Sequence, residues 1–397
     1  NSSLPILAAT LLFNQPVVLK NLPKVNDINT MINLLRSLGS KIILSKDRRV
    51  AKIHNNKKLK TFASYSLVKT MRGSILVLGP LIARYYKSKI SLPGGCLIGA
   101  RPINYHLESL KKLGMSYILK DGYILAKSKG KLKGTIIKFP RLTVGATENS
   151  IIAACLAKGT TILKNCAIEP EIKDLISFLK KLGAKINLKG RTISITESKA
   201  KSSKIVHEVI FDRIELGTYM IASVLSAKQG LLIDKIDPKI VKSELDVLKK
   251  IGVKIIRKKN SLIVKKGKRL NKINITTKPY PGFPTDLQAQ LMVLLTQANG
   301  ISRIKEDIFE NRFMHVPELK RMGAHIEIKD KTAIIKGPTK LTGAEVMATD
   351  LRASVSLVLA GLIGENRTII NRIYHLDRGY ENLERKLKNC KAKIKRI

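Results

Sequence analysis

The sequence predicts an α/β protein of two domains, each built from three copies of one repeated unit. Its 397 residues are too many for one hydrophobic core. A pattern of apolar residues ending in glycine recurs at intervals of roughly 70 residues. Helical stretches with few charges, such as residues 291–298, indicate helices buried inside rather than coating the sheets. Together these observations favour three units packed in a closed threefold arrangement in each domain over an open solenoid.

The repeated pattern is the end of a helix followed by a strand. In residues 179–188, apolar residues three apart share one helical face, Gly183 supplies the left-handed conformation that ends the helix, and alternation then begins a strand. A second helix, rich in small and apolar residues and followed by a strand, precedes each copy. Similar copies occupy residues 34–42, 110–114, 248–255 and 319–326, and a worn sixth copy at 387–394 has Lys391 in place of glycine.

A hydrophilic stretch at residues 197–204 lies midway between the third and fourth copies. Such composition is typical of a linker. We therefore expect the crossover between domains there, with the first domain at residues 1–207 and the second at 208–397.

The formal charge of +45 raises the possibility of nucleic-acid binding. However, lysine is spread along the whole chain, tryptophan is absent, and the aromatic residues are not interleaved with the basic ones as a stacking platform requires. We expect only weak, salt-sensitive retention on DNA and no specific nucleic-acid partner. A positive field of this size would still attract small polyanionic substrates.

The four cysteines show no CxxC pair and no regular spacing. This pattern favours a reducing cytoplasm and argues against disulfides and structural zinc. No apolar run approaches the ~20 residues that a membrane-spanning helix needs, so we expect no membrane contact. Cys155, Cys166 and Cys390 are interpreted as small hydrophobic residues of the core.

Residues 91–102 form the most unusual stretch, because three glycines and two prolines exclude a regular helix or strand there. In such a loop the backbone N–H groups can turn toward one point and bind an anion. A thiol in the middle, Cys96, and a guanidinium five residues later, Arg101, fit a catalytic arrangement. A surface turn with an incidental cysteine is the equally weighted alternative from this stretch alone.

Five motifs together carry a resemblance to a known family: LPGGCLIGARP at 92–102, FPTDLQAQ at 283–290, FENRFMHVPELKRM at 309–322, MATDLRA at 347–353 and IYHLDRGY at 373–380. With these motifs, the chain closely resembles the UDP-N-acetylglucosamine enolpyruvyl transferases (1-carboxyvinyltransferases) along its whole length. The resemblance implies two inside-out α/β barrels with pseudo-threefold symmetry and an active-site cleft between them. The six repeats were found independently and agree with it.

The resemblance also implies the reaction. Members of the family transfer the enolpyruvyl group of phosphoenolpyruvate to the 3-hydroxyl of UDP-N-acetylglucosamine and release phosphate, by addition and elimination through a tetrahedral ketal. This chemistry requires an acid for the enol methylene, a base for the sugar hydroxyl, and cations around phosphate and carboxylate. We expect these two substrates as partners, no metal or organic cofactor, and a monomer.

The family's residues are expected at matching positions. Cys96 matches the proton donor that forms adducts and is alkylated by fosfomycin, on a lid that closes after the nucleotide sugar binds. Asp286 matches the base near the sugar hydroxyl, and Thr285 is expected to cap the helix that follows. Asp350 stands in a similar Thr-Asp pair. For both aspartates, a helix N-cap is the alternative role. The arginines expected around phosphoenolpyruvate are Arg101, Arg352 and Arg378.

The remaining expected contacts form three groups. The stretches expected to hold the nucleotide sugar comprise Arg72, Arg101, Pro102, Ile103, Asn104, Tyr105, Arg141 (often lysine in the family), Leu142, Thr143, Val144 and Gly145. Further substrate contacts are expected at Asn1, Ile308, Arg312 and Asp350. His106, His315 and His375 are expected to make structural hydrogen bonds. Glu169 and Glu171 are expected to lie at the start of a helix.

One departure concerns the residue before Asn1, where the family carries a lysine needed for phosphoenolpyruvate binding. We expect a chain of residues 1–397 alone to be inactive or severely impaired, and an open sheet edge where the family has a preceding strand. Two alternative functions stay open. The first is the sister transferase acting on shikimate 3-phosphate, distinguished by thiol dependence and UDP-sugar binding; the second is an inactive basic binding protein.

Overall fold

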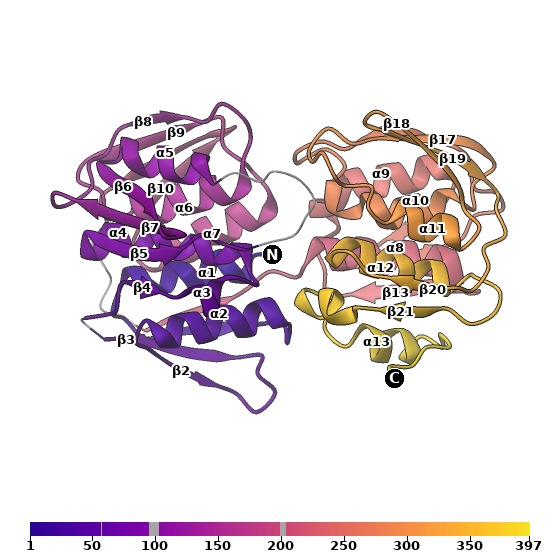
Figure 1. Ribbon diagram of the computed structural model, residues 1–397, viewed down its shortest axis with the longest axis horizontal. Helices are drawn as coiled ribbons and strands as arrows, with labels where there is room; N and C mark the ends of the chain where they lie inside the picture. The colour runs from indigo at the N-terminus through magenta and orange to yellow at the C-terminus, as the bar shows by residue number, and fades with distance from the viewer. Residues whose placement is uncertain (57, 95–102, 199–203) are drawn as a thin grey trace. The chain divides into compact units, whose positions relative to one another are not determined.

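The computed structural model describes residues 1–56, 58–94, 103–198 and 204–397. The described chain divides into two compact units, the first extending to Ile210 and the second spanning Phe211–Ile397 (Figure 1). The strand at Ile205–Glu208 pairs with Val17–Lys20 and therefore belongs to the first unit. The chain passes to the second unit just after this strand.

The first unit contains three four-stranded sheets of one design. In each sheet a parallel pair of strands is extended by an antiparallel hairpin. The sheets, in strand order, are β12 (Ile205–Glu208), β1 (Val17–Lys20), β3 (Ala51–Asn55) and β2 (Ser40–Leu44); β4 (Phe62–Ala63), β5 (Lys87–Ser91), β7 (Tyr123–Ser128) and β6 (Met115–Lys120); and β8 (Ile136–Lys138), β9 (Thr160–Lys164), β11 (Thr192–Thr196) and β10 (Lys185–Lys189).

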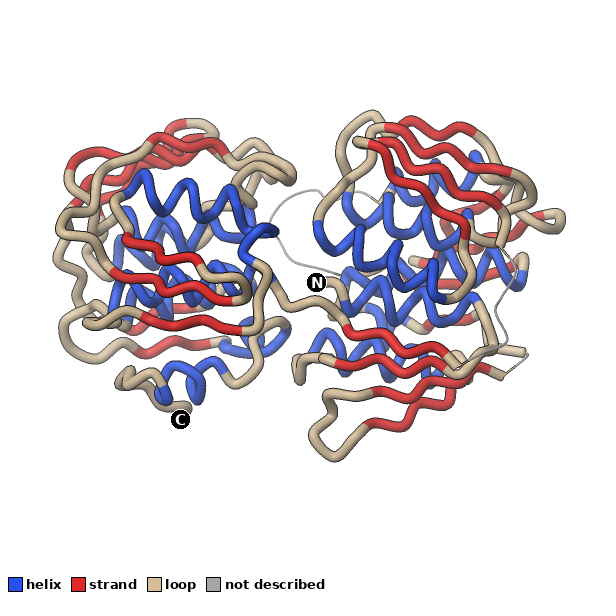
Figure 2. The backbone as a smooth tube through the Cα atoms, turned by 180° about the vertical axis from the view of Figure 1, so that it is seen from behind, coloured by secondary structure: helices blue, strands red, loops and turns tan. Residues whose placement is uncertain are grey.

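The helices of the first unit lie inside the sheets, as Figure 2 shows in blue. The helices α1 (Ser3–Ala9), α4 (Leu78–Tyr85) and α6 (Val144–Ala154) are composed mainly of small and apolar residues, and most of their side chains are buried. The amphipathic helices α2 (Asn26–Ser37), α5 (Asn104–Lys112) and α7 (Pro170–Lys181) end before glycines with positive φ, as predicted. Short turns of helix complete the unit: η1 (Thr10–Leu12), α3 (Tyr65–Val68) and η2 (Arg72–Val77).

The second unit also has internal helices, but among its described residues one sheet has the four-stranded design of the first unit, and the other two are a three-stranded antiparallel sheet and a parallel pair of strands. Its sheets are β13 (Leu231–Asp234), β15 (Ser261–Lys265) and β14 (Lys254–Arg257); β16 (Asn274–Thr276), β17 (Gly300–Lys305), β19 (Thr332–Gly337) and β18 (His325–Lys329); and β20 (Glu345–Met347) with β21 (Ile369–Asn371). Three buried helices contact one another at its centre: α8 (Arg213–Ser226), α10 (Gln288–Leu295) and α12 (Leu351–Gly361). The remaining helices are η3 (Pro238–Val241), α9 (Lys242–Ile251), η4 (Thr285–Leu287), α11 (Val316–Arg321), η5 (Ile373–Arg378) and α13 (Leu383–Asn389).

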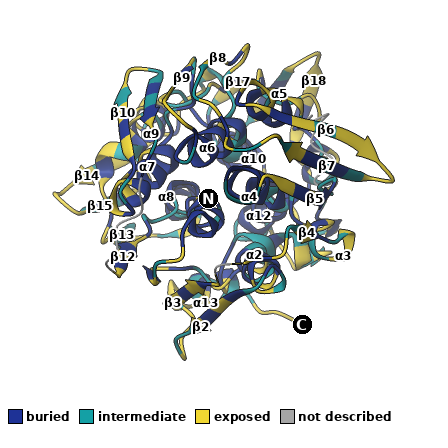
Figure 3. Ribbon diagram, turned by 90° about the vertical axis from the view of Figure 1, so that its left-hand side faces the viewer, coloured by how far each residue is buried: buried dark blue, intermediate teal, exposed yellow. Residues whose placement is uncertain are grey.

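Burial follows the same plan in both units. Figure 3 shows the inner helices in dark blue, whereas exposed residues gather on the strands and loops. In β11 the burial alternates, with Ile193 and Ile195 facing a core of helices. The predicted α/β class with repeated units and internal helices is therefore confirmed. No helix among the described residues is long and apolar enough to cross a membrane.

Two details of the repeats bear on the sequence predictions. The sixth repeat stops α13 in the same way as the others, because Lys391 adopts φ +68° where they have glycine. Cys155 and Cys166 are buried, as predicted, and burial raises the pKa of each thiol to about 12. The prediction for Cys390 was wrong: this residue follows the end of α13, and its side chain is exposed.

Candidate active site

The most distinctive polar feature of the second unit is a carboxylate held by two guanidinium groups. Asp286 Oδ1 accepts a hydrogen bond from Arg312 Nη2 at 2.7 Å, and Oδ2 accepts one from Arg352 Nη2 at 2.9 Å. The two arginine side chains are 4% and 9% exposed, whereas the aspartate side chain is 34% exposed. Two buried cations therefore fix the orientation of a carboxylate that solvent or a ligand can reach.

The segment that carries Asp286 is anchored by Glu306. Thr285 Oγ1 donates to Glu306 Oε2 at 2.9 Å, while Glu306 Oε1 accepts from the backbone N–H groups of Ile308 and Phe309. The prediction that Thr285 caps the helix was therefore wrong, because its hydroxyl donates to the buried carboxylate of Glu306 and not to the start of the helix. This connection ties the turn at Ile308, a predicted substrate contact that is half-buried, to the residue preceding Asp286.

Asp350 performs the capping role that the sequence left open as an alternative. Its Oδ1 accepts from the backbone N–H groups of Arg352 at 2.8 Å and Ala353 at 3.2 Å, so it begins α12 and orients Arg352. The side chain is buried. Burial lowers the pKa of Arg352, but the electrostatic interactions with Asp286, Tyr380 and Asp212 and the hydrogen bond to Asp286 together outweigh it and hold the pKa of this guanidinium above its ordinary value.

Arg378 lies at the end of η5, a segment that packs against α12. The contact is close: a Cβ on Gly379 would lie 2.8 Å from Leu351 Cδ2. Arg378 is half-buried and follows a helix turn next to the start of α12. Asp286, Arg312, Arg352 and Arg378 are thus carried by elements that pack together within one unit.

Two histidines near these elements have pKa values below the ordinary value. Burial lowers the pKa of His315 to about 4, with the charge of Arg312 adding to the effect and that of Asp350 opposing it. Burial and the neighbouring Arg378 also lower the pKa of His375. In the first unit, His106 Nδ1 lies 3.2 Å from Asn149 Nδ2, which agrees with the structural role predicted for it.

The predicted sugar-binding stretches of the first unit lie at the starts of three helices that Asn149 connects. Its amide donates to Ile75 O at 3.1 Å, and its Oδ1 accepts from Gly79 N at 2.8 Å. A Cβ on Gly145 would lie 3.1 Å from His106, which brings the start of α6 against α5. Of the predicted residues there, Asn1, Asn104, Arg141 and Val144 are exposed and Arg72, Ile103, Tyr105, Leu142, Thr143 and Gly145 are half-buried.

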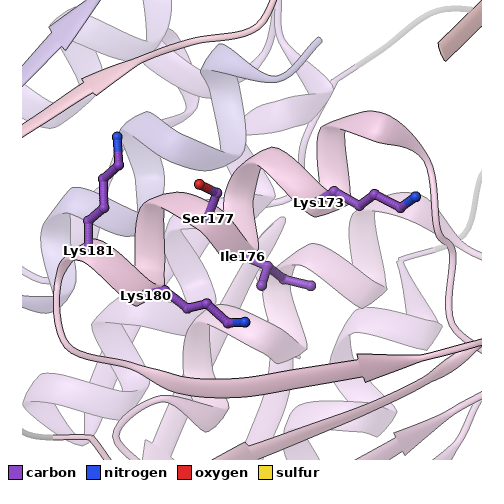
Figure 4. Close-up of a pocket in the computed structure, with 5 residues that line it drawn as sticks. All are labelled: Lys173, Ile176, Ser177, Lys180 and Lys181. Atoms are coloured by element: carbon purple, nitrogen blue, oxygen red, sulfur yellow. The ribbon is translucent and has the colours of Figure 1, made fainter. Parts of the chain in front are cut away.

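Cys96, Arg101 and Pro102 lie outside the described residues. Among the described residues, no group of His, Cys, Asp and Glu side chains could hold a metal ion. The hollow shown in Figure 4 is lined by Lys173, Ile176, Ser177, Lys180 and Lys181 of α7, and none of these residues was predicted to be functional.

Sequence reasoning missed several buried polar residues. Four such residues lie around the Asp286–Arg352 pair: Thr218, Gln290, Glu306 and Tyr380. Gln290 and Tyr380 are the last residues of the motifs at 283–290 and 373–380. In the first unit, Glu169 and Glu171 lie at the start of α7 as predicted, and both are buried. Burial and the charges of Glu171 and Glu169 raise the pKa of the neighbouring Glu148 well above its ordinary value.

Residues 1–387 match the family model described as EPSP synthase (3-phosphoshikimate 1-carboxyvinyltransferase). The chain belongs to this enolpyruvyl transferase family. It is 57% identical to the UDP-N-acetylglucosamine 1-carboxyvinyltransferase of Pelagibacter ubique over 397 residues, covering 100% of this chain and 94% of that relative. It is 50% identical to the enzyme of the same name from Thermodesulfovibrio yellowstonii, covering 100% and 94%. The resemblance inferred from the motifs is thereby confirmed.

Solved structures of this family support the fold. The enolpyruvyl transferase NikO from Streptomyces tendae superimposes with a TM-score of 0.90 at 24% identity, covering 99% of this chain and 93% of that one. The EPSP synthase from Acinetobacter baumannii gives a TM-score of 0.75 at 16% identity, covering 98% and 94%. The inside-out α/β architecture is shared by all three proteins.

Proposed function

We propose that this chain transfers the enolpyruvyl group of phosphoenolpyruvate to the 3-hydroxyl of UDP-N-acetylglucosamine and releases phosphate, the first committed step of peptidoglycan synthesis. The observation that carries the proposal is the 57% identity, over the whole chain, to a relative named for this activity. The geometry around Asp286 supports it, because an accessible carboxylate in a fixed orientation is what removal of a hydroxyl proton requires.

The proposed mechanism assigns each proton. Asp286 accepts the proton of the sugar hydroxyl as the oxygen attacks C2 of phosphoenolpyruvate, and Cys96 gives a proton to the methylene carbon, which forms a tetrahedral ketal. The Cys96 thiolate then takes a proton back from the new methyl group as the C–O bond to phosphate breaks, which releases phosphate and restores the carbon–carbon double bond. Arg378 and Arg101 are proposed to neutralise the phosphate and carboxylate of phosphoenolpyruvate. Arg352 acts on Asp286, to which it is hydrogen-bonded.

The overall charge fits such substrates. Both are small anions, and a net charge of +45 would raise their concentration near the protein in a salt-dependent manner. We propose that the protein works in the cytoplasm as a monomer, without a metal or organic cofactor and without a nucleic-acid or membrane partner. The nucleotide sugar is proposed to lie against the starts of η2, α5 and α6 in the first unit.

The main alternative substrate is shikimate 3-phosphate, because the family model carries the name of that transferase. The test is phosphate release from phosphoenolpyruvate with each acceptor, using protein expressed from its complete coding sequence. We expect kcat/KM with UDP-N-acetylglucosamine to exceed that with shikimate 3-phosphate by at least roughly 100-fold. Equal rates with both acceptors, or none with the nucleotide sugar, would overturn the proposal.

The role of the loop thiol is tested in the same assay. Cys96→Ser should lower kcat by roughly 100-fold or more, because a hydroxyl is a much weaker proton donor than a thiol. Cys390→Ser is the matched control, since it replaces an exposed thiol far along the chain and should leave the rate unchanged. Equal rates for the two variants would remove Cys96 from the mechanism.

A further inference from the structure

A buried polar cluster lies at the centre of the second unit, where apolar helices pack together. Its members are Thr218 on α8, Gln290 on α10 and Tyr380 just after η5, which are 1%, 0% and 2% exposed. The hydroxyl groups of Thr218 and Tyr380 are 2.8 Å apart. Gln290 Nε2 lies 3.2 Å from the first and 3.4 Å from the second.

The cluster reaches Asp286 by two routes. Arg352 donates from Nη1 to the hydroxyl of Tyr380 at 3.4 Å and from Nη2 to Asp286 Oδ2 at 2.9 Å. Gln290 Nε2 donates to the backbone carbonyl of Asp286 at 3.0 Å. One route therefore holds the carboxylate and the other holds the backbone of the same residue.

The hydrogen-bond directions follow from the number of protons available. The hydroxyl of Thr218 donates to Ile214 O, 2.9 Å away within α8, so its oxygen is left to accept. Burial raises the pKa of Tyr380, which keeps its proton and donates it to Thr218. The oxygen of Tyr380 is then free to accept from Arg352. The result is a directed chain of hydrogen bonds from the guanidinium to the backbone of α8.

This polar cluster does not by itself stabilise the fold. Buried polar groups cost free energy unless every one is hydrogen-bonded, and Gln290 Oε1 has no hydrogen-bond partner among the described residues. Apolar side chains would pack α8, α10 and α12 without that cost. The cluster contacts both members of the Asp286–Arg352 pair, and this position supports a functional role for it.

We infer that Tyr380, supported by Thr218 and Gln290, is a positioning residue that aims Arg352 at Asp286 and so orients the carboxylate for removal of the sugar proton. The inference rests on the function proposed above. Tyr380 is not expected to touch either substrate. It acts on the orientation of Asp286, whose side chain is 34% exposed.

The test compares Tyr380→Phe with Tyr219→Phe. The second variant also removes a buried hydroxyl from the second unit, but that hydroxyl has no hydrogen-bond partner among the described residues. For Tyr380→Phe we expect kcat to fall roughly 10-fold with KM for UDP-N-acetylglucosamine changed less than about twofold. The acid limb of the pH–rate profile should move to higher pH, because a carboxylate with a loosened guanidinium neighbour is protonated more readily. Tyr219→Phe should change neither kcat nor the profile.

A second pair of variants separates positioning from packing. Thr218→Ser keeps the acceptor oxygen and should retain most of the activity, whereas Thr218→Val is similar in shape, lacks that oxygen and should reproduce the loss seen for Tyr380→Phe. These variants decide the question if Tyr380→Phe does not fold. Unchanged kcat and pH profile in Tyr380→Phe or Thr218→Val, with only a lower melting temperature, would overturn the inference. Absence of UDP-N-acetylglucosamine-dependent turnover in the unmutated protein would instead refute the proposed function.

Discussion

The pair formed by Asp286 and Arg352 can be tested by a double-mutant cycle on unfolding. Asp286→Asn leaves two guanidinium groups, 4% and 9% exposed, facing a neutral amide. Losing one partner of a buried ion pair costs roughly 3–5 kcal/mol, and the partial exposure of Asp286 places the expected loss near about 3 kcal/mol. Arg352→Met should cost about 2 kcal/mol, since Arg312 still pairs with the carboxylate. The double variant leaves only Arg312 unpaired and should cost about 3 kcal/mol, which gives a coupling energy of about 2 kcal/mol.

The assay is equilibrium unfolding in urea followed by circular dichroism, using the transition of the second unit. The matched control is the ion pair between Lys340 and Glu365, which has the same 2.7 Å separation as the Arg312–Asp286 contact but side chains that are 75% and 54% exposed. The cycle of Lys340→Met and Glu365→Gln should give a coupling of less than about 1 kcal/mol. A coupling for Asp286 and Arg352 no larger than that of this surface pair would refute the view that the two residues form one buried electrostatic unit.

Three further outcomes are expected. His315 should destabilise the fold by about 3 kcal/mol as pH falls from 6.5 to 4, because its folded pKa of about 4 lies below the unfolded value of 6.5 and the unfolded state therefore binds more protons. His315→Gln should remove this loss of stability, whereas His325→Gln, at an exposed position, should not. Equal acid sensitivity of the two variants would contradict the prediction. Glu148→Gln should raise the melting temperature, and the increase should grow as pH rises above 4.5. The reason is that the raised pKa of Glu148 makes the folded state hold a proton which the unfolded state releases. If the difference in melting temperature between the variant and the unmutated protein does not grow between pH 5 and 8, the pKa of Glu148 is not raised by its surroundings. Lys391→Gly should raise the free energy of unfolding by about 0.5 kcal/mol, because glycine adopts the left-handed backbone at φ +68° without strain. Gly323→Lys should lower the free energy of unfolding for the same reason. If urea unfolding shows that the first variant is destabilised and the second stabilised, the strain argument is refuted.

The fold could be predicted largely because each repeat carries its own local signals. The glycine after each outer helix predicts where the helix ends, and the positive φ of Gly183 and Gly323 agrees with it. Even the worn sixth copy kept the conformation when glycine was replaced by Lys391. The exposure of Cys390 was not predictable in this way, because the side of a terminal helix that faces solvent depends on which elements cover it, and those lie elsewhere in the chain.

The site could be predicted only in part. Asp286, Arg312 and Arg352 stand in quoted motifs, but their mutual hydrogen bonds join residues up to 66 positions apart, and no local pattern specifies them. Thr285 illustrates the limit: a threonine before a helix is typical of a cap, yet its hydroxyl donates to Glu306, 21 residues further along the chain, just after β17. The cluster of Gln290 and Tyr380 could not be predicted, because the two residues are 90 positions apart and the sequence around each one does not indicate the other as its partner.

The most direct test of the account is to identify the product formed from phosphoenolpyruvate and UDP-N-acetylglucosamine by nuclear magnetic resonance. The account predicts an enol ether on the 3-oxygen of the sugar, formed in equal amount to the phosphate released. Phosphate released without any enol ether would show simple hydrolysis, and an ether at another hydroxyl would show that Asp286 does not face the 3-position; either result would contradict the central claim.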